Sequence, residues 1–253
     1  MSGGASRFRA MRDSQLWRSI FRIGIPRDAR DRVAVVLSSV FLHLHPARVS
    51  AASIRLRRTY CLGGLALLAF VILTVTGLLL MFYYRPTPEH AYGDIEDIVH
   101  VVPFGRFLRN LHRWAAHAMV LLVIAHMARV FHAGAYRPPR EFNWIVGVFL
   151  LVLTLFLSFT GYLLPWDQLA YWAVTVGTNM AAATPVLGHL GPFSIVGPDG
   201  DVRAFLLGDR VVGAAALLRF YVLHCLVVPF VMGLLMAVHF YRVRRNGGVA
   251  ARY

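Results

Sequence analysis

Four apolar runs, each long enough to cross a bilayer, constrain the fold of this chain more than any other feature. A membrane helix needs about 20 mainly apolar residues, so each run predicts one transmembrane helix. Only the second run contains charged residues, Arg113 and Arg129 near its ends, where long side chains can reach the interface. A hydrophobic content of 58% supports the same conclusion, an all-α integral membrane protein. The runs are about Tyr60–Tyr84, His112–His132, Trp144–Leu164 and Phe220–Tyr241.

The distribution of arginine predicts how these helices are oriented. Residues 1–58 hold twelve Arg, Arg129–Arg140 hold three, and the C-terminus from Arg242 holds four. The other two connections hold seven Arg together with eight of the twelve acidic residues. By the positive-inside rule, we expect both termini and the second connection in the cytoplasm, at a bacterial inner membrane. A basic tail for nucleic acid would also explain the net charge of +14, but this distribution favours membrane topology instead.

The segments outside the runs organise the rest of the chain. Residues 1–58 form an Arg-rich segment, in which stretches around Leu16–Ile23 and Arg32–Leu44 are expected to be helices lying in the membrane interface. A four-helix domain is predicted over residues 59–245 and a tail over residues 246–253. Between the third and fourth helices, Pro165–Arg219 is predicted to be a long external loop, and loops of this length are usually functional.

Four histidines occur at two nearly matched intervals inside the second and fourth runs. His112 and His126 are fourteen residues apart, and His224 and His239 are fifteen apart. At about 1.5 Å and 100° per residue, each interval returns to roughly the same helix face about 21–23 Å further along. The two helices run in the same direction, so His112 is predicted to face His224 near the outer surface, and His126 to face His239 near the cytoplasmic surface. Two stacked imidazole pairs suit two bis-histidine haems that form an electron path across the membrane.

The remaining histidines fit this pattern poorly. His117 lies about 140° around the helix from His112, and His132 about 120° from His126, so neither shares the haem-binding face. A ligand or proton-relay role is disfavoured for the histidines in connections or at interfaces, which are His43, His45, His90, His100 and His189.

Glycines repeat the same interval in the first and third runs. Gly63 and Gly77 are fourteen residues apart, as are Gly147 and Gly161. These two helices run opposite to the histidine helices. Gly63 and Gly147 are therefore predicted to lie level with His126 and His239, and the other two glycines level with the outer pair. Glycine lets a flat macrocycle approach the backbone closely, so the glycines are expected to form the walls of the haem sites.

Arginines near the ends of the histidine helices are candidates for binding haem propionates, which need cationic partners in a low dielectric. Arg109, Arg113 and Arg219 cluster at the outer ends of these helices, and Arg129 lies one turn beyond His126. The alternative for each of them is simple extension of the side chain to the membrane interface.

Six short strings resemble the cytochrome b/b6 family, and the resemblance covers about residues 58–245. It is nearest to the short cytochrome b6 form. The strings are Tyr60-Cys61-Leu62-Gly63-Gly64, Phe82-Tyr83-Tyr84-Arg85-Pro86, His112-Arg113-Trp114, Pro139-Arg140-Glu141, Gly161-Tyr162-Leu163-Leu164-Pro165-Trp166-Asp167-Gln168 and Arg219-Phe220-Tyr221.

This resemblance implies a set of cofactors. Members carry two b haems in a four-helix unit of a quinol–cytochrome c or quinol–plastocyanin oxidoreductase. His112 and His224 would ligate the low-potential haem, and His126 and His239 the high-potential haem. In b6-type members the cysteine matching Cys61 attaches a third haem through one thioether. The alternative is an inert apolar thiol, which is the interpretation we give to Cys225.

The resemblance also implies substrates and partners. The segment Tyr162–Trp172 matches the wall of the quinol-oxidation pocket, with Tyr162 and Asp167 as candidates near quinol. The family's second half and its Pro-Glu-Trp-Tyr-type string are missing, so a separate subunit is expected to supply them. A Rieske-type iron–sulfur protein or a c-type cytochrome, membrane lipid and a dimeric complex are the other expected partners.

Two functions follow from these predictions. In the first, the chain carries electrons between quinol oxidation near the outer surface and quinone reduction near the cytoplasm. The alternative is a dihaem anchor that passes electrons between quinones and a multihaem cytochrome or molybdoenzyme without bifurcation. A transporter is disfavoured, because its ionisable residues would line a water path rather than form two registered histidine pairs.

Overall fold

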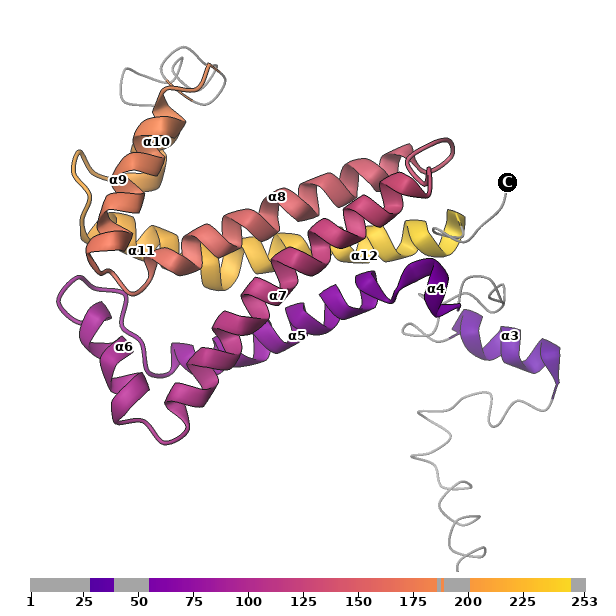
Figure 1. Ribbon diagram of the computed structural model, residues 1–253, viewed down its shortest axis with the longest axis horizontal. Helices are drawn as coiled ribbons and strands as arrows, with labels where there is room; N and C mark the ends of the chain where they lie inside the picture. Colours follow the sequence, from indigo (N-terminus) through magenta and orange to yellow (C-terminus); the bar gives the residue numbers. More distant parts are fainter. Residues whose placement is uncertain (1–27, 39–54, 186–187, 189–200, 247–253) are drawn as a thin grey trace, which may run out of the picture. The chain divides into compact units, whose positions relative to one another are not determined.

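The computed structural model describes residues 28–38, 55–185, 188 and 201–246, and every regular element in these residues is a helix (Figure 1). Two compact units make up the chain: residues 59–239, and residues 1–58 together with 240–253. In the latter unit, α3 (Ala29–Ser38) overlaps the helix expected from Arg32 to Leu44. The helix expected around Leu16–Ile23 lies outside the described residues.

Four helical segments are long and apolar enough to cross a membrane, which confirms the predicted all-α architecture with four spans. The short α4 (Leu56–Thr59) precedes the first of them. In each span only 11–17% of the most apolar stretch is buried, so most of that stretch is at least partly exposed, as expected where lipid is the solvent. The spans are α5 (Leu62–Met81), α7 (Gly105–His132), α8 (Glu141–Leu163) and Ala214–Arg245, which comprises α11 (Ala214–Val222), the π-helical turn η3 (Leu223–Val227) and most of α12 (Val228–Asn246).

Three spans begin earlier than their apolar runs, two of them by six residues or more. α7 starts at Gly105 rather than His112, and the fourth span starts at Ala214 rather than Phe220. At about 1.5 Å per residue, α7 is about 42 Å long, whereas the hydrocarbon core is about 30 Å thick. Hydropathy detects only the part of a helix inside the hydrocarbon, so it does not detect first turns that extend into the interface.

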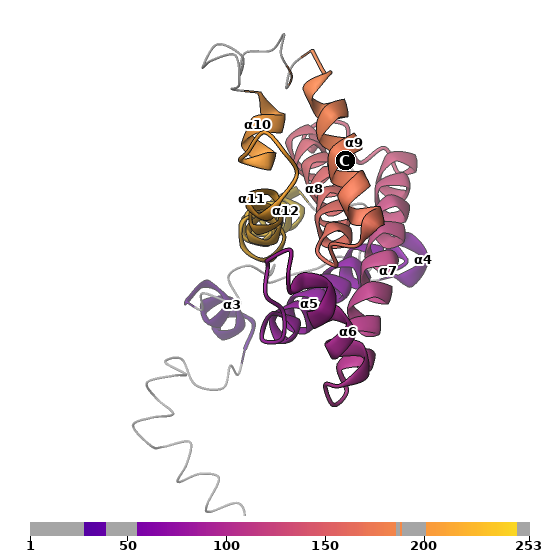
Figure 2. The ribbon, with the colours of Figure 1, turned by 90° about the vertical axis from the view of Figure 1, so that its left-hand side faces the viewer.

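Both connections at the end of the bundle nearer His112, called here the His112 end, contain further helices. The first contains α6 (Ala91–His100), and the second contains α9 (Gln168–Ala182) and α10 (Val202–Leu207), which contacts both α9 and α11 (Figures 1 and 2). Asp167 and Asp201 cap α9 and α10, because the Oδ1 atom of each accepts a backbone N–H three residues later at 2.8 Å. The described part of the predicted long loop is therefore largely helical.

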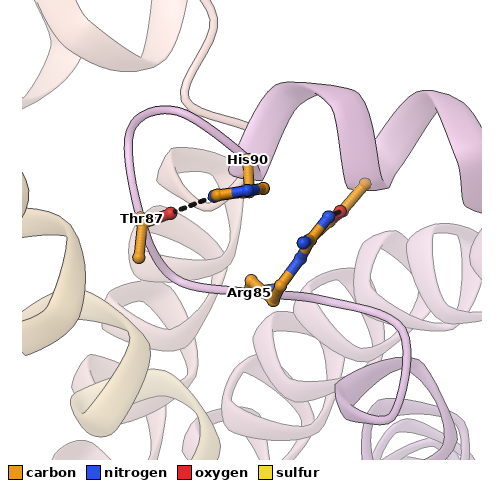
Figure 3. A network of polar contacts seen from close by, with 4 residues as sticks. Arg85, Thr87 and His90 are labelled. Carbon is orange, nitrogen blue, oxygen red and sulfur yellow. Dashed lines mark hydrogen bonds and ion pairs between the residues drawn. The ribbon is translucent and has the colours of Figure 1, made fainter.

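An ion pair attaches α6 to the end of α5. Both nitrogens of the Arg85 fork reach the buried Asp94, with Nη2–Oδ1 at 2.6 Å and Nε–Oδ2 at 3.1 Å, and the Arg85 backbone N–H donates to Oδ2 at 2.7 Å. In the turn between them, Thr87 Oγ1 and His90 Nδ1 are 2.9 Å apart (Figure 3). Hydrogen bonds from Arg85 lower the pKa of Asp94, and the same contact raises the pKa of Arg85.

A tyrosine connects the same turn to the end of α8. The Tyr84 hydroxyl donates to the Leu164 carbonyl at 2.6 Å, and the Tyr84 ring stacks on Tyr221 with centroids 5.7 Å apart. Burial raises the pKa of Tyr84, so the hydroxyl stays protonated as the donor that this contact needs. These contacts join segments from three of the four spans at the His112 end.

Asp94→Asn is expected to loosen α6, because it replaces charge-assisted hydrogen bonds with weaker neutral ones. Amide hydrogen exchange in α6 should become at least about tenfold faster. Since the pKa of Asp94 is lowered, its stabilising contribution is complete above about pH 4 and is lost as the pH falls through the lowered value. Asp97→Asn, an exposed neighbour on the same helix, is the control. Equal exchange rates in the two variants would contradict the role given to the ion pair.

Candidate functional site

The four histidines of the repeated interval form two facing pairs between α7 and the fourth span. The ring centroids of His112 and His224 are 6.3 Å apart with planes at 66°, and those of His126 and His239 are 6.3 Å apart with planes at 76°. All four side chains are half-buried. The structure therefore brings together the two pairs that parallel helices predict.

The separation of 6.3 Å fits one metal atom held between two imidazoles. A bond from a transition metal to imidazole nitrogen is about 2 Å, and a ring nitrogen lies about 1.1 Å from the ring centre, so two ligands on opposite sides of a metal have centroids about 6.2 Å apart. The planes of the two rings meet at 66° and 76°, so neither pair is stacked face to face. Within the described residues no cluster of three or more His, Cys, Asp or Glu could hold a metal, so each pair would supply two ligands from these residue types.

Each histidine of the two pairs faces one of the four predicted glycines. A Cβ added to Gly161 would lie 2.5 Å from His224 Cε1, one added to Gly77 would lie 3.2 Å from His112 Cε1, and one added to Gly63 would lie 3.3 Å from His126 Cε1. The contact at Gly147 is looser, because a Cβ added there would lie 3.9 Å from His239 Cε1. The imidazoles thus occupy the space that a side chain on α5 or α8 would fill.

Two threonines that the sequence analysis did not identify fix the rings of the pair at the His112 end. Thr76 Oγ1 donates to the Ile72 carbonyl at 2.7 Å and lies 2.8 Å from His112 Nδ1. Its single proton is used, so it accepts from Nδ1–H. Thr160 acts likewise, with the Leu157 carbonyl at 3.2 Å and His224 Nδ1 at 3.1 Å. Protons on Nδ1 leave both Nε2 lone pairs available for a metal.

The π-helical turn η3 explains why the two histidine intervals differ. In a straight α-helix, fourteen residues end about 40° short of four turns and fifteen residues end about 60° past them. His239 would then be rotated by about 100° relative to the position of His126 on α7. A π turn takes up one extra residue, and η3 begins one residue before His224. The fifteen-residue interval therefore acts as a fourteen-residue one.

A cavity and a packed layer define the two levels of the site. The cavity lies at the His112–His224 level, and both of these histidines line it. Its walls include Gly77, Ser158 and Cys225. Below it, the buried residues Ala69, Met119, Val228 and Met232 form an apolar layer. Met119 is seven residues from both His112 and His126, so this layer separates the two pairs.

The predicted arginines occupy different environments. Arg109 and Arg129 lie three residues from His112 and His126, one turn toward the helix ends and about 60° from the histidine faces. Arg113 is exposed. Arg219 donates to the carbonyls of Phe205 and Ala204, so its guanidinium connects α11 to α10.

Cys61 and the two residues predicted near quinol lie at opposite ends of the bundle. Cys61 is exposed at the N-cap of α5, with a left-handed backbone (φ 53°), and is two residues from Gly63, which contacts His126. The guanidinium carbon of Arg129 lies 6.0 Å from the centroid of the neighbouring Tyr60 ring. Tyr162 is exposed at the end of α8, whereas the carboxylate of Asp167 caps α9.

Comparisons with known proteins agree on one family. A family model described as Cytochrome b/b6/petB matches residues 48–247. Cytochrome b6 of Heliobacterium mobile is 46% identical over 188 residues, which are 74% of this chain and 83% of that protein. Cytochrome b6 of Synechocystis sp. is 42% identical over 188 residues, 74% of this chain and 80% of that protein. A solved chain titled Hyperthermophilic respiratory Complex III has a TM-score of 0.66 and 25% identity, and covers 94% of this chain. This chain spans only 54% of that solved chain.

Deleting Leu226 from η3 is expected to preserve both histidine pairs, because the remaining fourteen-residue interval matches a straight α-helix. Deleting Leu121 from α7, an exposed leucine between the two histidines of its own span, should rotate His126 by about 100° relative to His112. The two haems predicted from the sequence provide the readout, as haem b per chain in the purified membrane complex. We expect the Leu226 deletion to keep the haem b content and the Leu121 deletion to lose about half of it. Loss of haem after deletion of Leu226 would contradict the role given to η3.

Proposed function

This chain belongs to the cytochrome b/b6 family, and on this premise we propose that it is the haem-carrying membrane subunit of a quinol–cytochrome c oxidoreductase-type complex. In this proposal the complex oxidises quinol at the His112 end and reduces quinone at the His126 end. The observation that carries the proposal is the pair of facing imidazoles at 6.3 Å, found twice in one bundle and walled by glycine each time.

We assign His112 and His224 to one haem b and His126 and His239 to the other. When bound, haem b supplies reversible one-electron chemistry at its iron. The protein's part is to hold the two imidazoles apart at the ligand distance and to leave room for a flat ring between α5 and α8. Thr76 and Thr160 keep Nδ1 protonated at the His112 level, which orients both rings and raises the basicity of Nε2.

Arginines near each level supply positive charge for haem propionates. Arg109 and Arg129 are the stronger candidates, because each lies one turn from a ligand on nearly the same helix face. Arg113 has an exposed side chain and Arg219 has carbonyl partners on α10, so these two are assigned mainly to the interface and to the α10–α11 contact.

The quinol-oxidation pocket is proposed at the end of α8 and the start of α9, with Tyr162 on its wall. Asp167 shapes the pocket by starting α9, rather than by exchanging protons. The paired histidines, Tyr162 and Asp167 do not together supply both a general acid and a general base for quinol oxidation. The remaining groups are proposed to come from a separate subunit with the second half of cytochrome b and from a Rieske-type protein or c-type cytochrome, in a dimeric complex.

The arginine distribution supports a topology for this proposal. The His112 end is placed at the outer surface of a bacterial inner membrane, and both termini are placed in the cytoplasm. The helices α6, α9 and α10 then all lie on the outer side, near the proposed quinol pocket.

A third haem, attached at Cys61, is proposed beside the His126 level. The thiol would add across a vinyl group of the haem, forming one C–S bond while the thiol hydrogen goes to the other vinyl carbon. Cys61 is exposed, two residues from Gly63 and next to the Tyr60–Arg129 contact, so a haem there would lie close to the His126–His239 pair. Cys225 lies inside the bundle and keeps its assignment as an apolar thiol.

His126→Ala should remove one of two b-type absorbance signals and lower haem b per chain by about half, because one axial ligand is lost. His132→Ala on the same helix is the control, since its ring lies about 120° away from the haem face. Optical spectra at low temperature, with a redox titration, separate the two haems. If both b-type signals persisted in His126→Ala, the ligand assignment would be wrong, and so would the function proposed from it.

Cys61→Ser should abolish haem that survives acid–acetone extraction while leaving both b-type signals. Cys225→Ser is the matched control and should keep the covalent haem. Mass spectrometry of the denatured chain reports the attached group directly. A wild-type chain without added mass would remove the third haem from the proposal without affecting the two histidine pairs.

A further inference from the structure

A histidine of α7 lies at the middle of the membrane but outside both haem-binding pairs. Gly77 faces His112 and Gly63 faces His126, so residues of the antiparallel α5 and α7 lie level where their numbers add to 189. His117 is therefore level with Ile72, halfway along the twenty-residue α5. At about 1.5 Å per residue, His117 is about 15 Å from either end of that helix.

The His117 side chain points away from the bundle. It is exposed, and its ring lies edge-on to Trp114 with centroids 5.7 Å apart. Within the part of the chain that the structure describes, neither ring nitrogen has a hydrogen-bond partner. Asn110, Trp114, His117 and Leu121 follow each other at intervals of four, three and four residues, and all four are exposed. They form one stripe on the outer half of α7, called here the His117 stripe.

Lipid tails cannot satisfy the imidazole of His117 in this stripe. Hydrocarbon offers neither donors nor acceptors, and an imidazole is too short to reach an interface about 15 Å away. Polar side chains inside membranes are therefore usually found against other protein groups, and hydrogen bonds of this kind hold neighbouring helices together. A stripe with one imidazole, one amide and one indole is suited to a second transmembrane helix with hydrogen-bonding side chains.

We infer that the His117 stripe is the docking surface for a transmembrane helix of the subunit that supplies the second half of cytochrome b. This rests on the proposed function. It is also supported by length, since 46% of the solved Complex III chain has no counterpart here although the fold covers nearly all of this chain. His117 and Asn110 donate and accept hydrogen bonds with that helix, and Trp114 and Leu121 provide the apolar contact.

Photo-cross-linking in native membranes tests the inference. Benzoylphenylalanine at position 117 of the full chain should cross-link, on illumination, to a co-purifying protein with its own spans, at a residue inside one of those spans. The same group at Phe230, an exposed residue of α12, is the control and should give at most about one tenth as much of that adduct. Mass spectrometry of the adduct identifies the partner peptide.

A cross-link from position 117 to lipid, or to a second copy of this chain, would overturn the inference while leaving the haem assignments intact. Purification of a quinol-oxidising complex without any second spanning subunit would overturn both the inference and the separate-subunit part of the proposed function. The spectral tests of His126→Ala remain independent of either result.

Substitution at His117 gives a second test. His117→Leu should lower the amount of the partner that survives detergent purification by about tenfold, because a membrane hydrogen bond is lost. His117→Gln keeps a donor and an acceptor and should restore most of the partner. Both b-type spectra should be unchanged in both variants, since the ring faces away from both haem levels. Equal retention of the partner in His117→Leu and wild type would contradict the docking role.

Discussion

The distance between two facing imidazoles is the constraint on which the rest of this bundle depends. Ring centroids 6.3 Å apart at each of two levels give α7 and the fourth span a matched spacing along the bundle. The other two spans then approach a space that the imidazoles already occupy. Gly63, Gly77 and Gly161 allow this approach, because an added Cβ at each would come within 2.5–3.3 Å of a histidine ring.

The same constraint shapes the backbone of the fourth span. An extra residue between His224 and His239 would normally rotate one imidazole out of its pair, and the π turn η3, which contains His224, absorbs that residue. In a membrane the hydrophobic effect does little to hold helices together, so specific contacts have to do so. With only 11–17% of the most apolar stretch of each span buried, specific contacts hold the bundle together, among them the histidine pairs, the glycine walls, the small layer around Met119 and the Tyr84 contacts.

Much of this arrangement could be predicted from the sequence because it depends on periodicity. Apolar length identified four spans, and the fourteen- and fifteen-residue intervals of His and Gly placed residues from four helices at two common levels. The first two turns of α7 could not be predicted in this way, because they lie where hydropathy falls. Thr76 and Thr160 were also missed, although each directly precedes a predicted glycine, because threonine in a membrane helix usually bonds only to its own backbone. The helices α9 and α10 were not predicted, because they lie in a proline-containing segment. The aspartates that cap them, Asp167 and Asp201, were the sequence signal for these helices.

The cost of an unsatisfied polar group in hydrocarbon explains why the histidines of α7 have different environments. His112 and His126 face inward, where a partner ring and a glycine wall exclude lipid. His117, only five residues from His112, is turned outward by about 140° and has Trp114 beside it. A hydropathy scale gives these three histidines the same value, and only their angle around the axis of α7 distinguishes them. An inward imidazole can be satisfied by a ligand that this chain holds itself, whereas an outward one at mid-membrane depth needs a neighbouring protein. The angle of each histidine around α7 thus separates the inward positions proposed to bind haem from the outward face proposed to bind a partner helix.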